Sequence, residues 1–222
     1  MENLLNFLTD LTINNNREWF NDNKNRAEQA KQQMVLLTEM LINEIKQFDH
    51  SLAFTDAKDC LFRIYRDVRF SHDKSPYKNH FGSYMASDGR KGILPGYYIH
   101  IQPQNSFIAG GLHCPNKDIL QAVRQEIACN GDEFLQIINE PEFKKYFPEM
   151  VGEKLKTAPK GFEKDHPYID LLRHKSFDFF HPITDEELLS GEFMEKTLCA
   201  FEEVFHINRL FRSAILEAHE QQ

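Results

Sequence analysis

The sequence lacks several features that identify metal-dependent or redox-active proteins. Its 222 residues contain one tryptophan and four cysteines, and no two cysteines form a Cys-x-x-Cys pair. Zinc ribbons and dithiol redox sites are built on such pairs, so neither is indicated. We expect reduced, mostly buried side chains at all four positions: Cys60, Cys114, Cys129 and Cys199.

Long hydrophobic runs and a leader peptide are also missing. No stretch approaches the roughly eighteen uninterrupted apolar residues of a membrane-spanning helix. The N-terminal residues MENLLNFLTDLT lack the basic region, the apolar core and the cleavage site of a secretory signal. These absences predict a cytoplasmic protein with no membrane partner.

The composition is that of a folded globular protein. Hydrophobic residues make up 41% of the chain and aromatic residues 12%, which argues against disorder. The length suffices to bury a substantial core, and we expect a single domain over residues 1–222. The formal net charge of −8 disfavours a general nucleic-acid coat protein, because such proteins need broad positive charge.

Apolar residues recur at helical spacing in both terminal regions. The pattern predicts a short helix around Leu4–Leu11 and a long one from Arg17 to Phe48, with Asn15 as N-cap and Glu18 completing a capping box. We assign the Phe and Leu stripes of the long helices to the core. Further helices are predicted from residue 116 or 117 to 129, over 132–138 and 142–146, and over 184–215 with a break near 206–208.

Between residues 52 and 111 the hydrophobic period changes from helical to alternating. We predict strands near Leu61–Arg66, Phe81–Ala86, Gly96–Gln102 and Phe107–Leu112, and a further one within Leu172–Phe180. Short connections imply antiparallel neighbours. The predicted fold class is α+β, a mainly antiparallel sheet with long N- and C-terminal helices packed on one face. Alternation places Tyr97, Ile99 and Ile101 on one sheet face and these side chains on the other: Arg63, Tyr65, Tyr98 and His100.

The segment Leu61–Gly82, LFRIYRDVRFSHDKSPYKNHFG, is a basic island in an acidic chain. Against the two acids Asp67 and Asp73 it carries five basic side chains: Arg63, Arg66, Arg69, Lys74 and Lys78. Arginine presents a planar fork of donors that suits phosphate or carboxylate. One interpretation is an anion site, and the other is a structural network in which the arginines pair with nearby acids. Both stay open, and no reaction follows from these residue types.

Four sequence motifs follow one another along the chain: NNREWFxxNK near the start, FRIYRDVRFSxDKSPYKxH in the basic island, AGGLxxP at Ala109–Pro115 and PKGFxxDHP at Pro159–Pro167. Together they resemble the bacterial and fungal family catalogued as domain of unknown function 2461. The resemblance runs from about Leu4 to Phe211. It implies an α+β fold and no catalytic assignments.

The leading functional hypothesis is a pocket for a small phosphorylated or carboxylated ligand. The five basic side chains of the island would bind the anion, and a second set would orient it: Tyr65, Tyr77, Tyr98 and His100. A loop lysine and a carboxylate-supported histidine, Lys160 and His166, would close the pocket. A stabilised turn explains this last pair equally well.

Two other classes of function use the same residues. A nucleic-acid module would place the arginines on phosphates and the tyrosines on bases. An interaction protein would dock an acidic partner on the SHDKSPYK loop. None of the ten histidines forms an HExxH or HxxxH motif, and neither the dinucleotide-binding nor the P-loop pattern is present, so we expect no metal and no cofactor.

Overall fold

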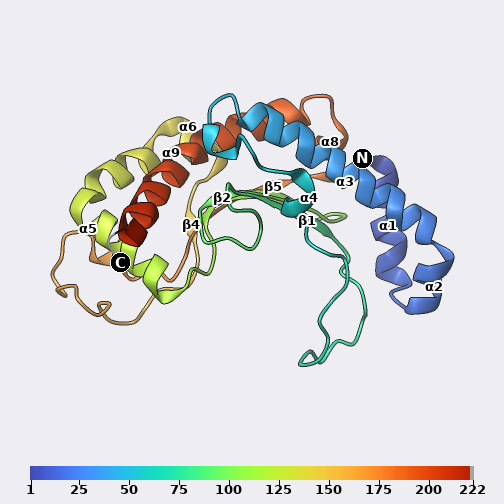
Figure 1. Cartoon of the computed structure of the whole chain (residues 1–222), viewed down its shortest axis with the longest axis horizontal. Helices are drawn as coiled ribbons and strands as arrows, with labels where there is room; N and C mark the ends of the chain where they lie inside the picture. The colour runs from blue at the N-terminus through green and yellow to red at the C-terminus, as the bar shows by residue number, and fades with distance from the viewer. Residues whose placement is uncertain (221–222) are drawn as a thin grey trace. The chain divides into compact units, whose positions relative to one another are not determined.

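The computed structural model describes residues 1–220 and has the predicted α+β fold (Figure 1). The chain forms two compact units. The first comprises Met1–Arg90, Tyr98–Ile108 and Pro182–Leu198, and the second comprises Lys91–Tyr97, Ala109–His181 and the chain from Cys199 onward. The single domain inferred from chain length stays a prediction.

The helices of the first unit begin with α1 (Glu2–Ile13), α2 (Arg17–Asp22) and α3 (Lys24–Ile45). The prediction of one helix from Arg17 to Phe48 is wrong, because the chain leaves the helical conformation at Asn23, which has φ −103° and ψ 18°. The side chain of Asn23 donates to Trp19 O at 2.9 Å, and such local bonds compete with the helical backbone. The predicted N-cap Asn15 is also wrong, since Asn16 accepts from Trp19 N.

One five-stranded antiparallel sheet has the order β1-β2-β3-β5-β4. Its strands are β1 (Phe81–Met85), β2 (Gly96–Ile101), β3 (Ser106–Leu112), β4 (Met150–Val151) and β5 (Phe177–Ile183). The last predicted strand therefore begins five residues later than expected, because α7 (Ile169–Leu172) includes its first residue and residues 173–176 lie between α7 and β5. In β2 the predicted alternation is confirmed: Tyr97, Ile99 and Ile101 are fully buried.

No strand forms over Leu61–Arg66. The structure has only isolated antiparallel bridges there, which join Leu61 to Ser83 and Tyr65 to Tyr77. The strand prediction is wrong because this segment pairs mainly with its own continuation rather than with the sheet. Short helical turns precede it, η1 (His50–Leu52) and α4 (Ala57–Cys60).

The second unit contains α5 (Lys117–Asn139), α6 (Pro141–Tyr146) and α7. Asn116 caps α5 with bonds of 3.0 Å from Asp118 N and Ile119 N. The two predicted helices over 117–138 form one element with a kink at Asn130, where φ is −123° and ψ 31°. Of the four cysteines only Cys60 is buried, so the expectation of mostly buried cysteines is wrong.

Near the C-terminus, α8 (Asp185–Leu189) begins with the predicted capping box of Thr184 and Glu187. The long helix α9 (Phe193–Glu220) then runs without the break predicted near 206–208. Asn208, at the end of the predicted break, is buried and bonds strand backbone, accepting from Gly111 N and donating to Gly96 O at 3.0 Å each. Within residues 1–220, no helix combines the length and apolarity needed to cross a membrane.

Glycine is required where α9 and β5 meet β3 in the second unit. Gly111 has φ +102°, and a Cβ atom there would collide with the carbonyl oxygen of Phe177. At Gly110 a Cβ atom would lie 2.6 Å from a methyl carbon of Val204 on α9. The Gly-Gly pair of the AGGL motif therefore allows the close packing of strand and helix.

Candidate functional site

Residues 62–80, here called the basic loop, form a long excursion that leads into β1 in the first unit (teal in Figure 1). Its two arms pair with each other through backbone bonds from Arg66 N to Pro76 O at 3.0 Å and from Lys78 N to Ile64 O at 2.7 Å. Pro76 has no backbone N–H, so it can occupy this edge position as an acceptor only. The arms hold the basic side chains on a defined framework.

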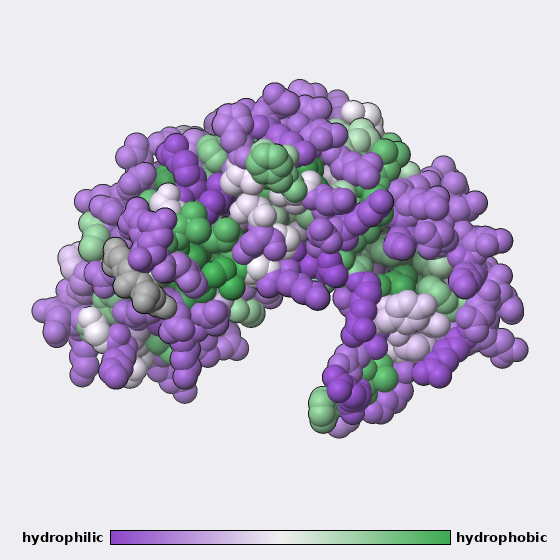
Figure 2. Space-filling model, viewed as in Figure 1, coloured by the Kyte–Doolittle hydropathy of each residue, from purple (hydrophilic) through white to green (hydrophobic). Residues whose placement is uncertain are grey.

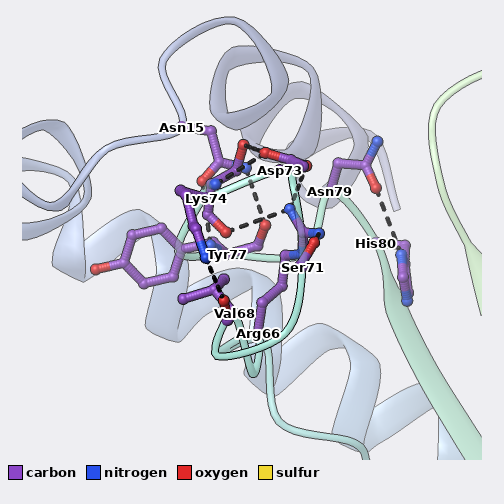
Figure 3. Close-up of polar contacts among 10 residues, drawn as sticks. Asn15, Arg66, Val68, Ser71, Asp73, Lys74, Tyr77, Asn79 and His80 are labelled. Atoms are coloured by element: carbon purple, nitrogen blue, oxygen red, sulfur yellow. Dashed lines mark hydrogen bonds and ion pairs between the residues drawn. The ribbon is translucent and has the colours of Figure 1, made fainter.

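The side chain of Arg66 contacts three residues at the tip of the basic loop (Figure 3). Its guanidinium forms an ion pair with Asp73 and donates to Ser71 Oγ and Ser75 O, each at 3.3 Å. Ser75 also donates to Asp73 from its hydroxyl at 2.5 Å and its backbone N–H at 2.9 Å. These Ser75 bonds, followed by Arg66, lower the pKa of Asp73 to about 2. Arg66 therefore acts as a clasp for the loop.

Two more basic side chains find partners within the basic loop. The guanidinium of Arg69 binds the carboxylate of Asp67 through Nε at 2.9 Å and Nη2 at 2.6 Å. The ammonium group of Lys74 donates to Val68 O at 3.0 Å. Arg66, Arg69 and Lys74 are therefore bound within the loop. Their contacts agree with the structural network, which was the alternative to an anion site.

An aromatic and amide anchor attaches the basic loop to the N-terminal helices. Asn15 accepts from Tyr77 N at 3.1 Å and donates to Tyr77 O at 2.9 Å. The Tyr77 ring is only 5% exposed and stacks on Phe20 of α2 at a centroid distance of 3.9 Å. Tyr65 lies 5.4 Å from Tyr77 and is 54% exposed. Of these two predicted ligand residues, only Tyr65 presents much of its ring to solvent.

Arg63 and Lys78 differ from the other three basic residues, because neither side chain forms an ion pair or a hydrogen bond within residues 1–220, whereas Arg66 and Arg69 have ion pairs and Lys74 has a hydrogen bond. The Lys78 ammonium lies 5.4 Å from the centroid of the Phe62 ring. Partial burial, and then repulsion from Arg63, lower the pKa of Lys78. The two cations are thus close enough to repel each other, and no carboxylate is paired with either.

Two histidines extend this group of basic side chains. The rings of His80 and His100 lie 4.2 Å apart between centroids. Burial, then His100 and Lys78, lower the pKa of His80 to about 4. We define the acid-free patch as Arg63, Lys78, His80 and His100. Reasoning from the sequence did not assign His80 to the ligand set, although its position two residues after Lys78, directly before β1, was a usable signal.

Tyr98 holds His100 in place. Its hydroxyl donates to His100 Nδ1 at 3.1 Å, and His100 Nε2 donates to Gln102 Oε1 at 3.0 Å. Burial raises the pKa of Tyr98 to about 12, so the hydroxyl keeps its proton at neutral pH. The ring of Tyr98 crosses Gly82 of β1, where a Cβ atom would collide with the hydroxyl. Tyr98 and His100 thus share a sheet face as predicted.

Lys160 and His166 belong to the second unit. Lys160 is exposed and precedes Gly161, which has φ +91°. His166 Nδ1 accepts from Tyr168 N at 3.2 Å, a bond that stabilises the local turn. Among the described residues no hydrogen bond joins His166 to Asp165, so the carboxylate support expected for this histidine is missing.

A different histidine of the second unit does have a carboxylate partner. His113 Nδ1 lies 3.0 Å from Asp178 Oδ2, with the carboxylate nearly buried and the imidazole largely exposed. Burial raises the pKa of Asp178, and His113 opposes that shift. Such a pair orients the ring, and no sequence pattern indicated it because the partners are 65 positions apart. The described part of the chain contains no group of three side chains that could hold a metal ion.

Comparison with known proteins gives one match. The model of a family described as "Conserved hypothetical protein (DUF2461)" matches residues 3–209. No curated protein and no solved structure matches the chain. Because the match covers nearly the whole sequence, the chain belongs to this family.

Proposed function

We propose that this member of the DUF2461 family is a cytoplasmic protein that binds the phosphate or carboxylate group of a small ligand at the acid-free patch. The observation that supports the proposal is the position of Lys78 beside Arg63, with a lowered Lys78 pKa and no ion-pair partner for either side chain among residues 1–220. A partly buried cation without a counter-charge is unfavourable. A bound anion would supply that charge.

The five basic residues predicted to meet the anion have two different roles in this proposal. Arg66, Arg69 and Lys74 shape the basic loop through their internal contacts. Arg63 and Lys78 contact the anion directly. An anion favours the imidazolium form of a neighbouring histidine, so His80 gains a proton and becomes a third donor when the ligand binds.

Tyr65, Tyr98 and His100 would orient the rest of the ligand. Tyr98 and His100 form a hydrogen-bonded wall whose donors and acceptors are already fixed, and Tyr65 offers an exposed ring. Tyr77 contributes by anchoring the loop. Lys160 and His166, which were expected to close the pocket, belong to the second unit, and the proposal does not include them in the patch.

A thermal-shift titration with inorganic phosphate at constant ionic strength tests the proposal. At 100 times Kd a ligand stabilises the folded state by about 2.7 kcal/mol, which is about 5–10 °C in Tm for a chain of this size. Arg63→Gln and Lys78→Gln should each remove most of the shift. Lys58→Gln, which removes an exposed lysine of α4, is the charge-matched control.

The same titration has results that would overturn the proposal. Equal shifts in Lys78→Gln, Arg63→Gln and Lys58→Gln would show that phosphate acts elsewhere. If the shift does depend on Arg63 and Lys78, titration with succinate and with a nucleoside monophosphate distinguishes carboxylate from phosphate recognition. Nuclear magnetic resonance adds an independent readout, since phosphate binding should raise the pKa of His80 above about 4.

A second candidate function is docking of an acidic protein partner on the basic loop. It is favoured by Phe70, which is 95% exposed and lies 6.0 Å from the guanidinium of Arg69. An exposed aromatic beside an arginine is typical of an interface anchor. Phe70→Ser should then abolish partner binding and leave the phosphate shift unchanged.

The nucleic-acid alternative has less support in the site geometry. Tyr77 is packed on Phe20 and Tyr98 is bonded to His100, so neither ring is free to stack on a base. A single-stranded oligonucleotide in the same titration is the check. Binding that weakens steeply with salt and is lost in Arg66→Ala would favour this alternative.

A further inference from the structure

Aromatic rings of the first unit form one cluster that includes both histidines of the acid-free patch. Figure 2 shows the basic loop, at the place it has in Figure 1, as a mainly hydrophilic arm on which some hydrophobic residues reach the surface. Where this loop joins the sheet, neighbouring ring centroids lie 4.2–6.2 Å apart in a group here called the ring cluster: Phe62, His80, Tyr98, His100 and Phe107. A sheet face that points away from the core is usually polar, so these rings suggest a binding surface.

Phe62 is the member of the ring cluster that is most open to solvent. It is 36% exposed, whereas the other four residues are buried or half-buried. The Tyr98 ring meets it edge to face, with an angle of 75° between the ring planes. Tyr98 is itself held by its hydrogen bond to His100, and Phe107 stacks on His100 at a centroid distance of 4.5 Å. The exposed part of Phe62 is therefore an aromatic surface supported from beneath.

The cations of the acid-free patch lie next to this aromatic surface. Lys78 Nζ is 5.4 Å from the centroid of the Phe62 ring, and Arg63 follows Phe62 in the sequence. The pKa of the Asp67 carboxylate is lowered mainly by Arg69 and also by Arg63. Arg69 binds that carboxylate at 2.9 and 2.6 Å, so Asp67 does not neutralise Arg63 and Lys78. Exposed aromatic surface and unpaired positive charge thus adjoin each other.

We infer that the small ligand of the acid-free patch carries an aromatic ring joined directly, or through one oxygen, to its anionic group, as an aryl phosphate does. This inference rests on the proposed function, because it needs the anion at Arg63 and Lys78. An anion oxygen bonded to an ammonium group lies about 2.8 Å from it, so a ring attached one atom further on reaches Phe62. Rings in contact adopt offset-stacked or edge-to-face geometry, which stabilises them beyond the area that they bury. A saturated ring of the same size gains the buried area alone.

Calorimetric titration with methyl, cyclohexyl and phenyl phosphate tests the inference. At pH 8 all three are dianions, because the second pKa of a phosphate monoester is about 6. Phenyl phosphate should bind about threefold to tenfold more tightly than cyclohexyl phosphate, which is the gain expected from one aromatic contact. Acetate, cyclohexanecarboxylate and benzoate repeat the comparison for a carboxylate group. A phosphotyrosine peptide that binds more tightly than phenyl phosphate would overturn the assignment to a small molecule.

Substitution of Phe62 separates the ring contact from charge. Phe62→Leu should make the affinities for phenyl and cyclohexyl phosphate equal, because leucine supplies apolar area without a ring. Their ratio within one variant cancels any general change in anion affinity. Phe54→Leu is the matched control and should keep the ratio, since Phe54 is 101% exposed and lies outside the ring cluster. Nuclear Overhauser contacts between the ring protons of the bound ester and those of Phe62 provide a second readout that needs no variant.

The outcomes separate this inference from the proposed function. Equal affinities for phenyl and cyclohexyl phosphate in the unsubstituted protein, or a preference that survives in Phe62→Leu, would overturn the inference. If methyl phosphate binds and is weakened by Lys78→Gln while the ring adds nothing, the anion site stands and the aromatic ligand is wrong. If no ester binds, or if Lys78→Gln binds all of them as tightly as the unsubstituted protein does, the proposed function and the inference both fail.

Discussion

The stability of this protein should fall in mildly acidic solution because of His174. This side chain is 3% exposed, and its Nδ1 atom is buried without a hydrogen-bond partner in the described part of the chain. Burial, followed by repulsion from Lys154, lowers its pKa from 6.5 to about 4. As pH falls below 6.5 the unfolded chain therefore binds a proton before the folded chain does. Stability is lost between about pH 6.5 and pH 4, and not further below.

The size of this loss follows from the two pKa values. Each pKa unit corresponds to 1.36 kcal/mol, so a fall from 6.5 to about 4 is worth about 3 kcal/mol in full and about 2 kcal/mol at pH 5. Domains are commonly stable by only about 5–15 kcal/mol. Protonation of one histidine therefore removes a substantial fraction of the free energy of unfolding between pH 7.5 and pH 5. His80, whose pKa is also about 4, adds to the loss over the same range.

Urea denaturation of the unsubstituted protein and of His174→Gln at pH 7.5 and 5.0 measures the effect. The variant should lose about 2 kcal/mol less than the unsubstituted protein over this interval, since glutamine does not titrate. His72→Gln, at an exposed position of the basic loop, controls for removal of a histidine. Identical losses in the unsubstituted protein and His174→Gln would refute the reasoning. If the variant does not fold, a pKa near 6.5 measured for His174 by nuclear magnetic resonance would refute it equally.

Three substitutions test other parts of the structure. Gly82→Ala should destabilise the protein by about 1–3 kcal/mol because its Cβ atom displaces the Tyr98 hydroxyl, whereas Gly191→Ala, with no atom within 4 Å of the new Cβ, should have little effect on Tm. Thr184→Ala should cost about 1 kcal/mol in denaturant unfolding through loss of the capping box of α8. Arg66→Ala should leave Tm nearly unchanged but accelerate limited proteolysis of the basic loop, and an unchanged cleavage rate would contradict its role as a clasp.

The parts of the fold that the sequence predicted correctly depend on local patterns. Alternation along β2 assigned Tyr97 and Ile99 to the core face and His100 to the other, and the structure confirms it. The capping box of α8 was also predicted correctly, because Thr184 and Glu187 are three residues apart in the sequence. In both cases the interacting positions are close in sequence, so the physics of one strand or one turn decides the outcome.

Apart from the helix end at Asn23, which has a local cause, several errors came from interactions between distant residues. The alternation in residues 61–66 suggested a strand, but Tyr65 pairs with Tyr77, and Asn15 holds Tyr77 from 62 positions away. Asn15 therefore forms a tertiary contact where the local pattern suggested a helix cap. The break predicted near 206–208 is absent, and Asn208 instead bonds the backbone of Gly96 and Gly111, about a hundred positions away in sequence.

The basic island illustrates why a count of charges does not identify a binding site. A count of charges does not distinguish its arginines, yet Arg66 and Arg69 have carboxylate partners and Arg63 has none among the residues that the structure describes. The side chains that can hold an external anion are those left without an internal one. That property depends on the path of the loop, which the spacing of the residues does not determine.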